Sequence, residues 1–309
     1  MTDNSQLATP ISHPQAWIES LRPRTLPLAC ASIITGSALA WWQGSFNLTT
    51  ALLALLTTVL LQILSNLAND YGDAVKGSDT PARIGPLRGM QKGAITQQQM
   101  RMAMALAVAL SMLSGIMLLI RSCKTLSDML GFLLLGALAI VAAIAYTVGR
   151  KPYGYLGLGD VSVMIFFGWL GVIGSWYLQT HQFNLLPLLP ATGCGLMATA
   201  VLNANNMRDI ENDRQNGKFT LAVRLGPHRA RHYHVLLLAG AIASFTLFTL
   251  MNNPQPFGWL FLLAVPLIWQ QARYVIHESS AMAMRPLLIR TVKTALLINV
   301  LFAIGLLLS

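Results

Sequence analysis

Long apolar segments recur along most of the chain, and short polar or charged stretches separate them. A helix needs about 20 residues to cross a bilayer, and the pattern supplies about nine segments of this kind. The predicted spans are residues 25–43, 47–68, 98–120, 129–148, 159–179, 184–204, 233–252, 256–272 and 287–308, with Pro266 interrupting the eighth. The pattern therefore predicts an all-α membrane protein, in which a polar segment (1–24) precedes one transmembrane domain (25–309).

The composition agrees with a membrane protein and changes how the charge is interpreted. Hydrophobic residues make up 54% of the 309 residues and charged residues 10%, whereas a soluble domain carries about 25% charged residues. The formal net charge is +10, which in a soluble protein would suggest nucleic-acid binding. Here the basic residues occupy short loops between apolar segments and no nucleic-acid-binding motif accompanies them, so we expect no nucleic-acid partner.

The basic residues predict the orientation of the bundle. One side of the predicted bundle carries only Arg121 and Lys124 in its loops. The loops of the other side carry Arg22, Arg24, Lys76, Arg83, Arg88, Lys92, Arg150, Lys151, Arg208, Arg214, Lys218, Arg224, Arg229, Arg231, Arg273, Arg285 and Arg290. Because loops rich in Lys and Arg remain in the cytoplasm, the N-terminus and this second set of loops are predicted to be cytoplasmic. The C-terminus is predicted to lie on the opposite side.

Two similar clusters of carboxylate and amide side chains follow the second and sixth predicted spans. Residues 66–73 have the sequence NLANDYGD and are followed by Asp79, and residues 205–213 have the sequence NNMRDIEND. Most of the few acidic residues of the chain belong to these clusters. A carboxylate beside a membrane is costly unless it is paired or holds a metal. Their placement on one predicted side therefore indicates a functional site.

The spacing within the clusters predicts the chemistry of that site. Asn205, Asp209 and Asp213 are four residues apart, as are Asn69 and Asp73, and on a helix such residues share one face. Neighbouring carboxylates repel one another unless a cation lies between them. Oxygen ligands without a nearby Cys or His favour Mg²⁺, which carboxylates usually share with substrate phosphates. Arg and Lys side chains of the same loops can bind phosphate oxygens directly, so the clusters predict a metal-assisted diphosphate site.

The clusters resemble the motifs of the UbiA superfamily of intramembrane prenyltransferases. That family carries an Asn-x-x-x-Asp-x-x-x-Asp motif after its second helix and a similar one after its sixth. The second motif is matched by residues 205–213, whereas the first is matched by Asn69 and Asp73 with either Asp79 or Asp70 as the third carboxylate. The basic element before the third helix resembles residues 88–96. The resemblance covers nearly the whole chain and includes the helix count.

Within the family, several segments resemble the members that prenylate 1,4-dihydroxy-2-naphthoate in menaquinone synthesis. These segments are residues 22–27, 66–73, 85–89, 146–160 and 218–226. The resemblance implies transfer of a polyprenyl chain from polyprenyl diphosphate to this aromatic acid, with loss of diphosphate and CO₂. It also implies Mg²⁺ as cofactor and residence in the bacterial inner membrane. The bundle would surround a central cavity that opens to the cytoplasm and laterally to lipid.

The resemblance and the residue chemistry together assign roles to individual side chains. The expected catalytic residues are Asp73, Asp209, Asp213 and Tyr146. The expected metal ligands are Asp70, Asp73, Asp79, Asp209 and Asp213. The expected diphosphate-binding residues are Asn69, Arg83, Arg88, Lys92, Asn205, Arg208 and Lys218. The aromatic acceptor is expected near Arg150, Lys151 and Tyr153.

Two other functions fit the sequence pattern. Acidic residues at helix ends also occur along the ion pathways of membrane transporters. Within the family, 4-hydroxybenzoate or another aromatic ring is an alternative acceptor, because charge and spacing do not identify a ring. The acceptor assignment at this point rests on the resemblance alone.

Overall fold

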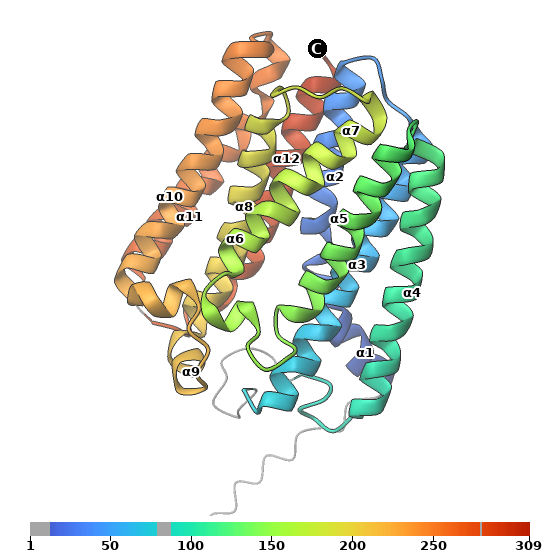
Figure 1. Cartoon of the computed structure of the whole chain (residues 1–309). Helices are drawn as coiled ribbons and strands as arrows, with labels where there is room; N and C mark the ends of the chain where they lie inside the picture. The colour runs from blue at the N-terminus through green and yellow to red at the C-terminus, as the bar shows by residue number, and fades with distance from the viewer. Residues whose placement is uncertain (1–12, 79–87, 279) are drawn as a thin grey trace, which may run out of the picture.

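The computed structural model describes residues 13–78, 88–278 and 280–309, and within these residues the regular elements are all helical (Figure 1). In chain order they are α1 (His13–Leu21), α2 (Leu26–Trp42), α3 (Leu48–Lys76), α4 (Gln97–Ser122), α5 (Leu126–Ala145), η1 (Tyr153–Leu156), α6 (Gly159–Val163), η2 (Met164–Ile173), α7 (Gly174–Thr180), α8 (Leu188–Arg208), α9 (Ile210–Gln215), α10 (Leu221–Asn252), η3 (Pro256–Ala264), α11 (Val265–His277) and α12 (Arg285–Leu307). Elements α6, η2 and α7 follow one another without a break and form the predicted fifth span.

Eight helical segments in the described part of the chain are long and apolar enough to cross a membrane. They correspond to eight of the predicted spans. The remaining predicted span is α8, which is rich in Ala, Gly and Asn and is buried along most of its length. Because α8 contacts protein on most sides, it does not need the apolar surface that a lipid-facing helix requires. The predicted all-α membrane fold is confirmed.

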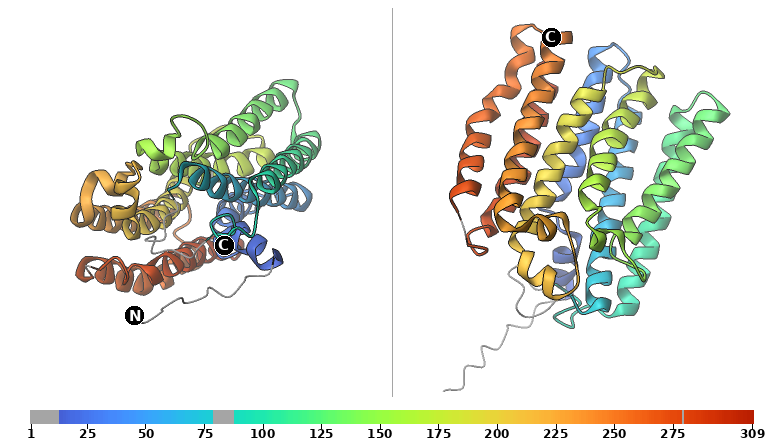
Figure 2. Two further views of the ribbon diagram at one scale, coloured as in Figure 1. Left: turned by 90° about the horizontal axis from the view of Figure 1, so that it is seen from below. Right: turned by 60° about the vertical axis from the view of Figure 1, so that its left-hand side comes forward.

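Both motifs lie at the same end of the bundle. In Figure 1 the end of α3, the short helix α9 and the N-terminal helix α1 lie at the lower end, and the C-terminus lies at the upper end. Figure 2 shows α4 and α5 on one side of the bundle and α10 and α11 on the other. Residues that are far apart in the sequence therefore lie together at this end of the bundle.

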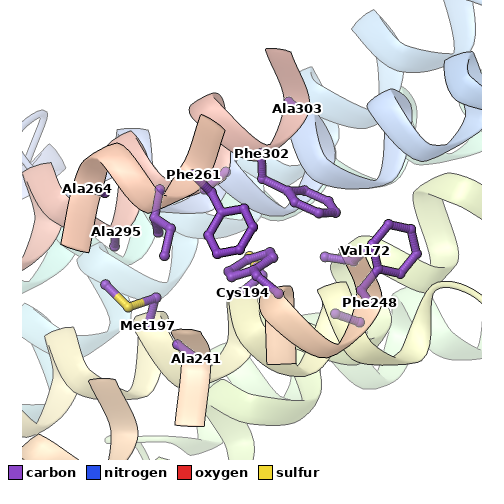
Figure 3. Packing of buried hydrophobic residues seen from close by; sticks show 14 of the residues in the cluster. Val172, Cys194, Met197, Ala241, Phe248, Phe261, Ala264, Ala295, Phe302 and Ala303 are labelled. Atoms are coloured by element: carbon purple, nitrogen blue, oxygen red, sulfur yellow. The ribbon is translucent and has the colours of Figure 1, made fainter. Parts of the chain in front are cut away.

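The densest packing lies on the side formed by α8, α10 and α12. Phe245, Phe248, Phe261 and Phe302 are fully buried there, and the rings of Phe245 and Phe302 have centroids 4.8 Å apart. Figure 3 shows Phe248, Phe261 and Phe302 within this cluster. By contrast, α5 has no buried residue along its length. Close-packed aromatic rings resist deformation, so one half of the bundle is a tightly packed scaffold, and the half that contains α5 is more open.

Local signals explain how α3 and α4 present the first motif. The predicted capping box at Thr96 and Gln99 is present at the start of α4. Helix α3 continues to Lys76, eight residues beyond the predicted span end at 68, and Gly77 ends it with φ 69°, a left-handed conformation that glycine adopts without strain. The first motif therefore lies within the last turns of a helix and not in the loop that follows.

Candidate active site

The first motif is held by two arginines from outside its own helix. Asp70 and Asp73 are 1% and 2% exposed. Arg22 donates to Asn69 Oδ1 at 2.8 Å and also to Asp70. The Arg88 guanidinium lies 3.2 Å from Asp70 and 2.8 Å from Asp73. These contacts satisfy carboxylates that would be costly to bury unpaired.

Tyr155 adds a neutral donor to the same carboxylate pair. Its hydroxyl donates to Asp73 Oδ1 at 2.7 Å and lies 2.8 Å from the Ser78 hydroxyl. Burial, followed by the charge of Asp73, raises the pKa of Tyr155. The phenol therefore remains protonated and keeps donating to Asp73 at neutral pH.

The second motif spans a break between two helices. Helix α8 ends at Arg208, Asp209 has φ −103° and ψ 10°, and α9 begins at the next residue. The predicted uninterrupted ladder of Asn205, Asp209 and Asp213 is therefore broken at its middle member. The backbone N–H of Asp213 nevertheless donates to the Asp209 carbonyl at 2.8 Å, and all three side chains line the same cavity.

Arg208 supports the second motif from within. Its Nε donates to Asp209 Oδ1 at 2.8 Å, and its Nη2 donates to Asn205 Oδ1 at 3.0 Å. Arg208 is 6% exposed. Its Nη2 also donates to Asp209 Oδ2 at 2.5 Å, so the buried guanidinium binds both carboxylate oxygens of Asp209 and holds it beside Asn205.

Lys218 lies between the two motifs. Its Nζ is 3.8 Å from Asp73 Oδ2 and 3.9 Å from Asp213 Oδ1, and 5.3 Å from the centroid of the Tyr155 ring. Gly217, with φ 69°, forms the turn that places it there. The two motifs therefore face each other, and both carboxylates lie near one cation.

A cavity of about 1290 Å³ extends from the two motifs into the bundle. Its polar end is lined by both motifs together with Arg22, Arg88, Arg208 and Lys218. Its body is lined by apolar side chains of α2, α4, α5 and η2, among them Ile33, Leu118, Leu133, Phe166 and Leu170. The polar end and the apolar body of the cavity suit a ligand with an anionic head and a long apolar tail.

Tyr146 and Tyr153 lie on the wall of this cavity near its polar end. Their rings meet edge to face with centroids 5.3 Å apart. Tyr153 is fixed by hydrogen bonds to the Ala142 carbonyl at 2.9 Å and with the Ser162 hydroxyl at 3.0 Å. Burial raises the pKa of Tyr146, so its phenol stays neutral.

Arg150 and Lys151 lie outside this cavity. Both are exposed, and they line a smaller hollow of about 370 Å³ together with Lys76, Tyr155 and Phe219. Tyr155 thus forms part of the hollow while its hydroxyl contacts Asp73 on the motif.

Of the other predicted diphosphate-binding residues, Lys92 forms an ion pair with Glu19 at 3.0 Å and is not part of the cavity lining. Asp79 and Arg83 lie outside the described residues. The fold brings the remaining five predicted residues together in the lining of the cavity: Asn69, Arg88, Asn205, Arg208 and Lys218.

Two residues of the site were not predicted from the sequence. Arg22 was interpreted only as a topological charge, although its backbone has φ 53°, an unfavourable conformation for a non-glycine residue that is typical of functional positions. Tyr155 was overlooked in favour of Tyr153. The segment 22–27, which carried part of the family resemblance, was the signal for Arg22; no local pattern singled out Tyr155.

The donor set of the site suits Mg²⁺ only in combination with a substrate. Among the described residues, no three His, Cys, Asp or Glu side chains are grouped closely enough to hold a metal by themselves. Asp73, Asp209 and Asp213 nevertheless line one cavity. Mg²⁺ is usually bound by one or two carboxylates plus substrate phosphates, and this arrangement fits that mode.

Comparison with known proteins decides the family. The sequence model of the UbiA prenyltransferase family matches residues 29–307. The chain belongs to this family. As a UbiA family member it is 64% identical over 299 residues to the 1,4-dihydroxy-2-naphthoate octaprenyltransferase of Escherichia coli (strain K12), a match that covers 97% of each chain.

Solved structures share the UbiA fold. A UbiA homologue from Aeropyrum pernix K1 has a TM-score of 0.63 at 18% identity, covering 91% of this chain and 97% of that one. A UbiA homologue from Archaeoglobus fulgidus, solved bound to GPP and Mg²⁺, has a TM-score of 0.59 at 15% identity, covering 93% and 99%. These likenesses confirm the predicted helical architecture.

Proposed function

We propose that this protein transfers a polyprenyl chain from polyprenyl diphosphate to 1,4-dihydroxy-2-naphthoate. Diphosphate and CO₂ leave, and demethylmenaquinone forms in its reduced state. The observation that carries this proposal is the 64% identity, over nearly the full length, to a protein named for this reaction. The cavity supports it, because its polar end and apolar body match the two parts of a polyprenyl diphosphate.

The diphosphate would bind at the polar end of the cavity. Arg88, Arg208 and Lys218 would contact its oxygen atoms as charged donors, and Asn69 and Asn205 would position it. Arg22, which already contacts Asn69 and Asp70, would add a further cation. Mg²⁺ held by Asp73, Asp209 and Asp213 would offset the negative charge of the leaving diphosphate.

The reaction needs no general base. The allylic C–O bond breaks and its electron pair leaves with the diphosphate, so C1 of the prenyl chain becomes cation-like. The ring carbon that bears the carboxylate attacks C1. When CO₂ then leaves, the electron pair of the broken C–C bond restores the aromatic ring. The protein therefore has to stabilise charge and exclude water.

Tyr146 and Tyr153 would face the cation-like C1. Both line the cavity beside the polar end, and the face of a tyrosine ring attracts a cation. Arg150 and Lys151 would contact the carboxylate of the aromatic acceptor as the acceptor approaches the site, because Tyr155 lines the same hollow.

For the third carboxylate of the first motif we propose Asp79. Asp70 already contacts the guanidinium groups of Arg22 and Arg88, which leaves it less available to a metal. Asp79→Asn is expected to raise the Mg²⁺ concentration needed for half-maximal turnover more than Asp70→Asn does. The reverse order would assign the metal to Asp70.

We propose the bacterial inner membrane as its location, with both motifs on the cytoplasmic side. Support comes from the basic residues near the motif end of the bundle, including Lys76, Arg150 and Arg224, against only Arg121 and Lys124 in the other loops. A cysteine introduced at position 309 and treated with a membrane-impermeant thiol reagent would test the proposal. We expect this cysteine to be labelled from the periplasmic side.

The central experiment uses purified protein in lipid nanodiscs with Mg²⁺ and a polyprenyl diphosphate. One arm supplies 1,4-dihydroxy-2-naphthoate and the other 4-hydroxybenzoate. We expect a prenylated, decarboxylated product from the first arm. Product only from the second arm would reassign the acceptor, and no product from either would overturn the enzymatic proposal.

A further inference from the structure

Asp160 is a buried carboxylate that no role described so far uses. It lies in the first turn of α6 and is 5% exposed. The Tyr233 hydroxyl on α10 donates to it, but its Oδ1 has no hydrogen-bond partner among the described residues. An incompletely satisfied buried carboxylate is costly. Such a group in a well-packed protein calls for an explanation.

Asp160 directly follows, in the sequence, a glycine that contacts Tyr146. The residue before it, Gly159, packs against the Tyr146 side chain so closely that a Cβ added at Gly159 would lie 2.9 Å from the tyrosine hydroxyl oxygen. Tyr146 forms part of the cavity wall, whereas Asp160 does not. Asp160 therefore lies outside the cavity lining and beside the residue that packs against the Tyr146 hydroxyl.

The electrostatic connection between the two groups has a definite direction. Burial and then the charge of Asp160 raise the pKa of Tyr146, so the phenol keeps its proton. A negative charge near a neutral hydroxyl attracts the hydrogen end of the O–H dipole. The oxygen lone pairs are then turned away from the carboxylate.

We propose that Asp160 is a positioning residue that orients the Tyr146 hydroxyl so that its oxygen lone pairs face the cation-like C1 of the prenyl donor. Preorganised dipoles of this kind stabilise developing charge without reorganising during the reaction. Because departure of CO₂ supplies the electron pair that restores the ring, Asp160 does not act as a base. This inference rests on the proposed prenyl transfer.

A double-mutant cycle tests the proposal. Turnover and the KM of both substrates are measured for the wild type, Asp160→Asn, Tyr146→Phe and the double variant. We expect Asp160→Asn to lower kcat about tenfold with each KM within about twofold, and the double variant to equal Tyr146→Phe alone. Asp128→Asn is the matched control, because Asp128 also accepts a tyrosine hydroxyl bond, from Tyr177 at 2.7 Å, away from the cavity. It should retain wild-type turnover.

The outcomes separate the inference from the proposed function. Absence of product from the wild type overturns the function itself. A productive wild type with unchanged turnover in Asp160→Asn, or with losses that multiply in the double variant, overturns the inference alone. If Asp160→Asn does not fold, Tyr233→Phe replaces it in the same cycle. It removes only the donor to the carboxylate, and its smaller loss must likewise disappear in the Tyr146→Phe background.

Discussion

The two motifs share an asparagine followed four residues later by an aspartate, but they have different support in the structure. Residues from distant segments hold the first motif: Arg22 contacts Asp70, and Arg88 and Tyr155 contact Asp73. The second motif is supported by Arg208, which belongs to the motif itself and contacts Asp209 and Asn205. Similar side chains are therefore held mainly by contacts from distant segments in the first motif, whereas in the second motif an arginine of the motif itself holds Asn205 and Asp209.

Lys218 is the point at which the two motifs meet, since it lies 3.8 Å from Asp73 and 3.9 Å from Asp213. Both carboxylates would therefore act on one bound diphosphate. The two motifs differ in how each is held in place, whereas the proposed chemistry requires both.

The largest effect is expected from removing either carboxylate beside Lys218. Asp73→Ala and Asp213→Ala should each lower kcat by roughly 10²–10³-fold, the loss typical when one group that stabilises transition-state charge is removed. Product formation at saturating Mg²⁺ measures it, with circular dichroism to verify that the helices persist. Full activity of both variants would contradict the metal–diphosphate site, and loss in only one would show that the halves are not equivalent.

A second experiment compares the supporting arginines. Arg208→Met leaves Asp209 without its guanidinium partner, so we expect a loss of about 3 kcal/mol in unfolding free energy. Arg88→Met should cost less, about 1 kcal/mol, because Asp70 keeps Arg22 and Asp73 keeps Tyr155. Unfolding in denaturant without Mg²⁺ or substrate measures both. Equal losses would mean that the contacts of the first motif are not redundant.

A smaller effect is expected from one neutral donor of the first motif. Tyr155→Phe removes the hydroxyl that lies 2.7 Å from Asp73, and we expect kcat to fall about fivefold, equivalent to about 1 kcal/mol. Tyr177→Phe, which removes a tyrosine–aspartate hydrogen bond away from the cavity, is the control. A fivefold loss in the control as well would assign the effect to general stability.

The smallest effect is expected at the exposed basic pair. Arg150→Ala and Lys151→Ala should raise the KM for the aromatic acid by about twofold with unchanged kcat, because exposed charges contribute little individually and both lie in the smaller hollow. Steady-state kinetics with the acceptor varied measures it. A large fall in kcat would instead place these residues at the reacting atoms.

Hydrophobic pattern and charge were sufficient to predict the class of fold. The spans, the capping box at Thr96 and the shared end of the two motifs all follow from local sequence. Two details of helix ends were wrong: α3 extends through the first motif, and Asp209 interrupts the helix of the second. Helix ends depend on capping and on contacts beyond the bilayer, which hydropathy does not measure.

The candidate site was predicted in part. Asn69, Asp73, Asn205, Asp209 and Asp213 were found because their spacing repeats along the chain, and all line one cavity. Arg22 and Tyr155 were missed, because they are 47 and 82 residues from the motif residues that they contact. Neither belongs to a repeating pattern, so only packing brings them to the motif.

Local sequence was sufficient to predict the membrane-spanning helices, the placement of two acidic motifs on one side and the kind of ligand they suit. These properties depend on local hydropathy, on helical periodicity and on the chemistry of side-chain types. Tertiary packing was needed to show which cations hold each carboxylate, that Lys218 lies between the motifs, and that the segment carrying Asp160 packs against Tyr146. Contacts between distant segments depend on how helices pack, and packing is set by the whole bundle at once.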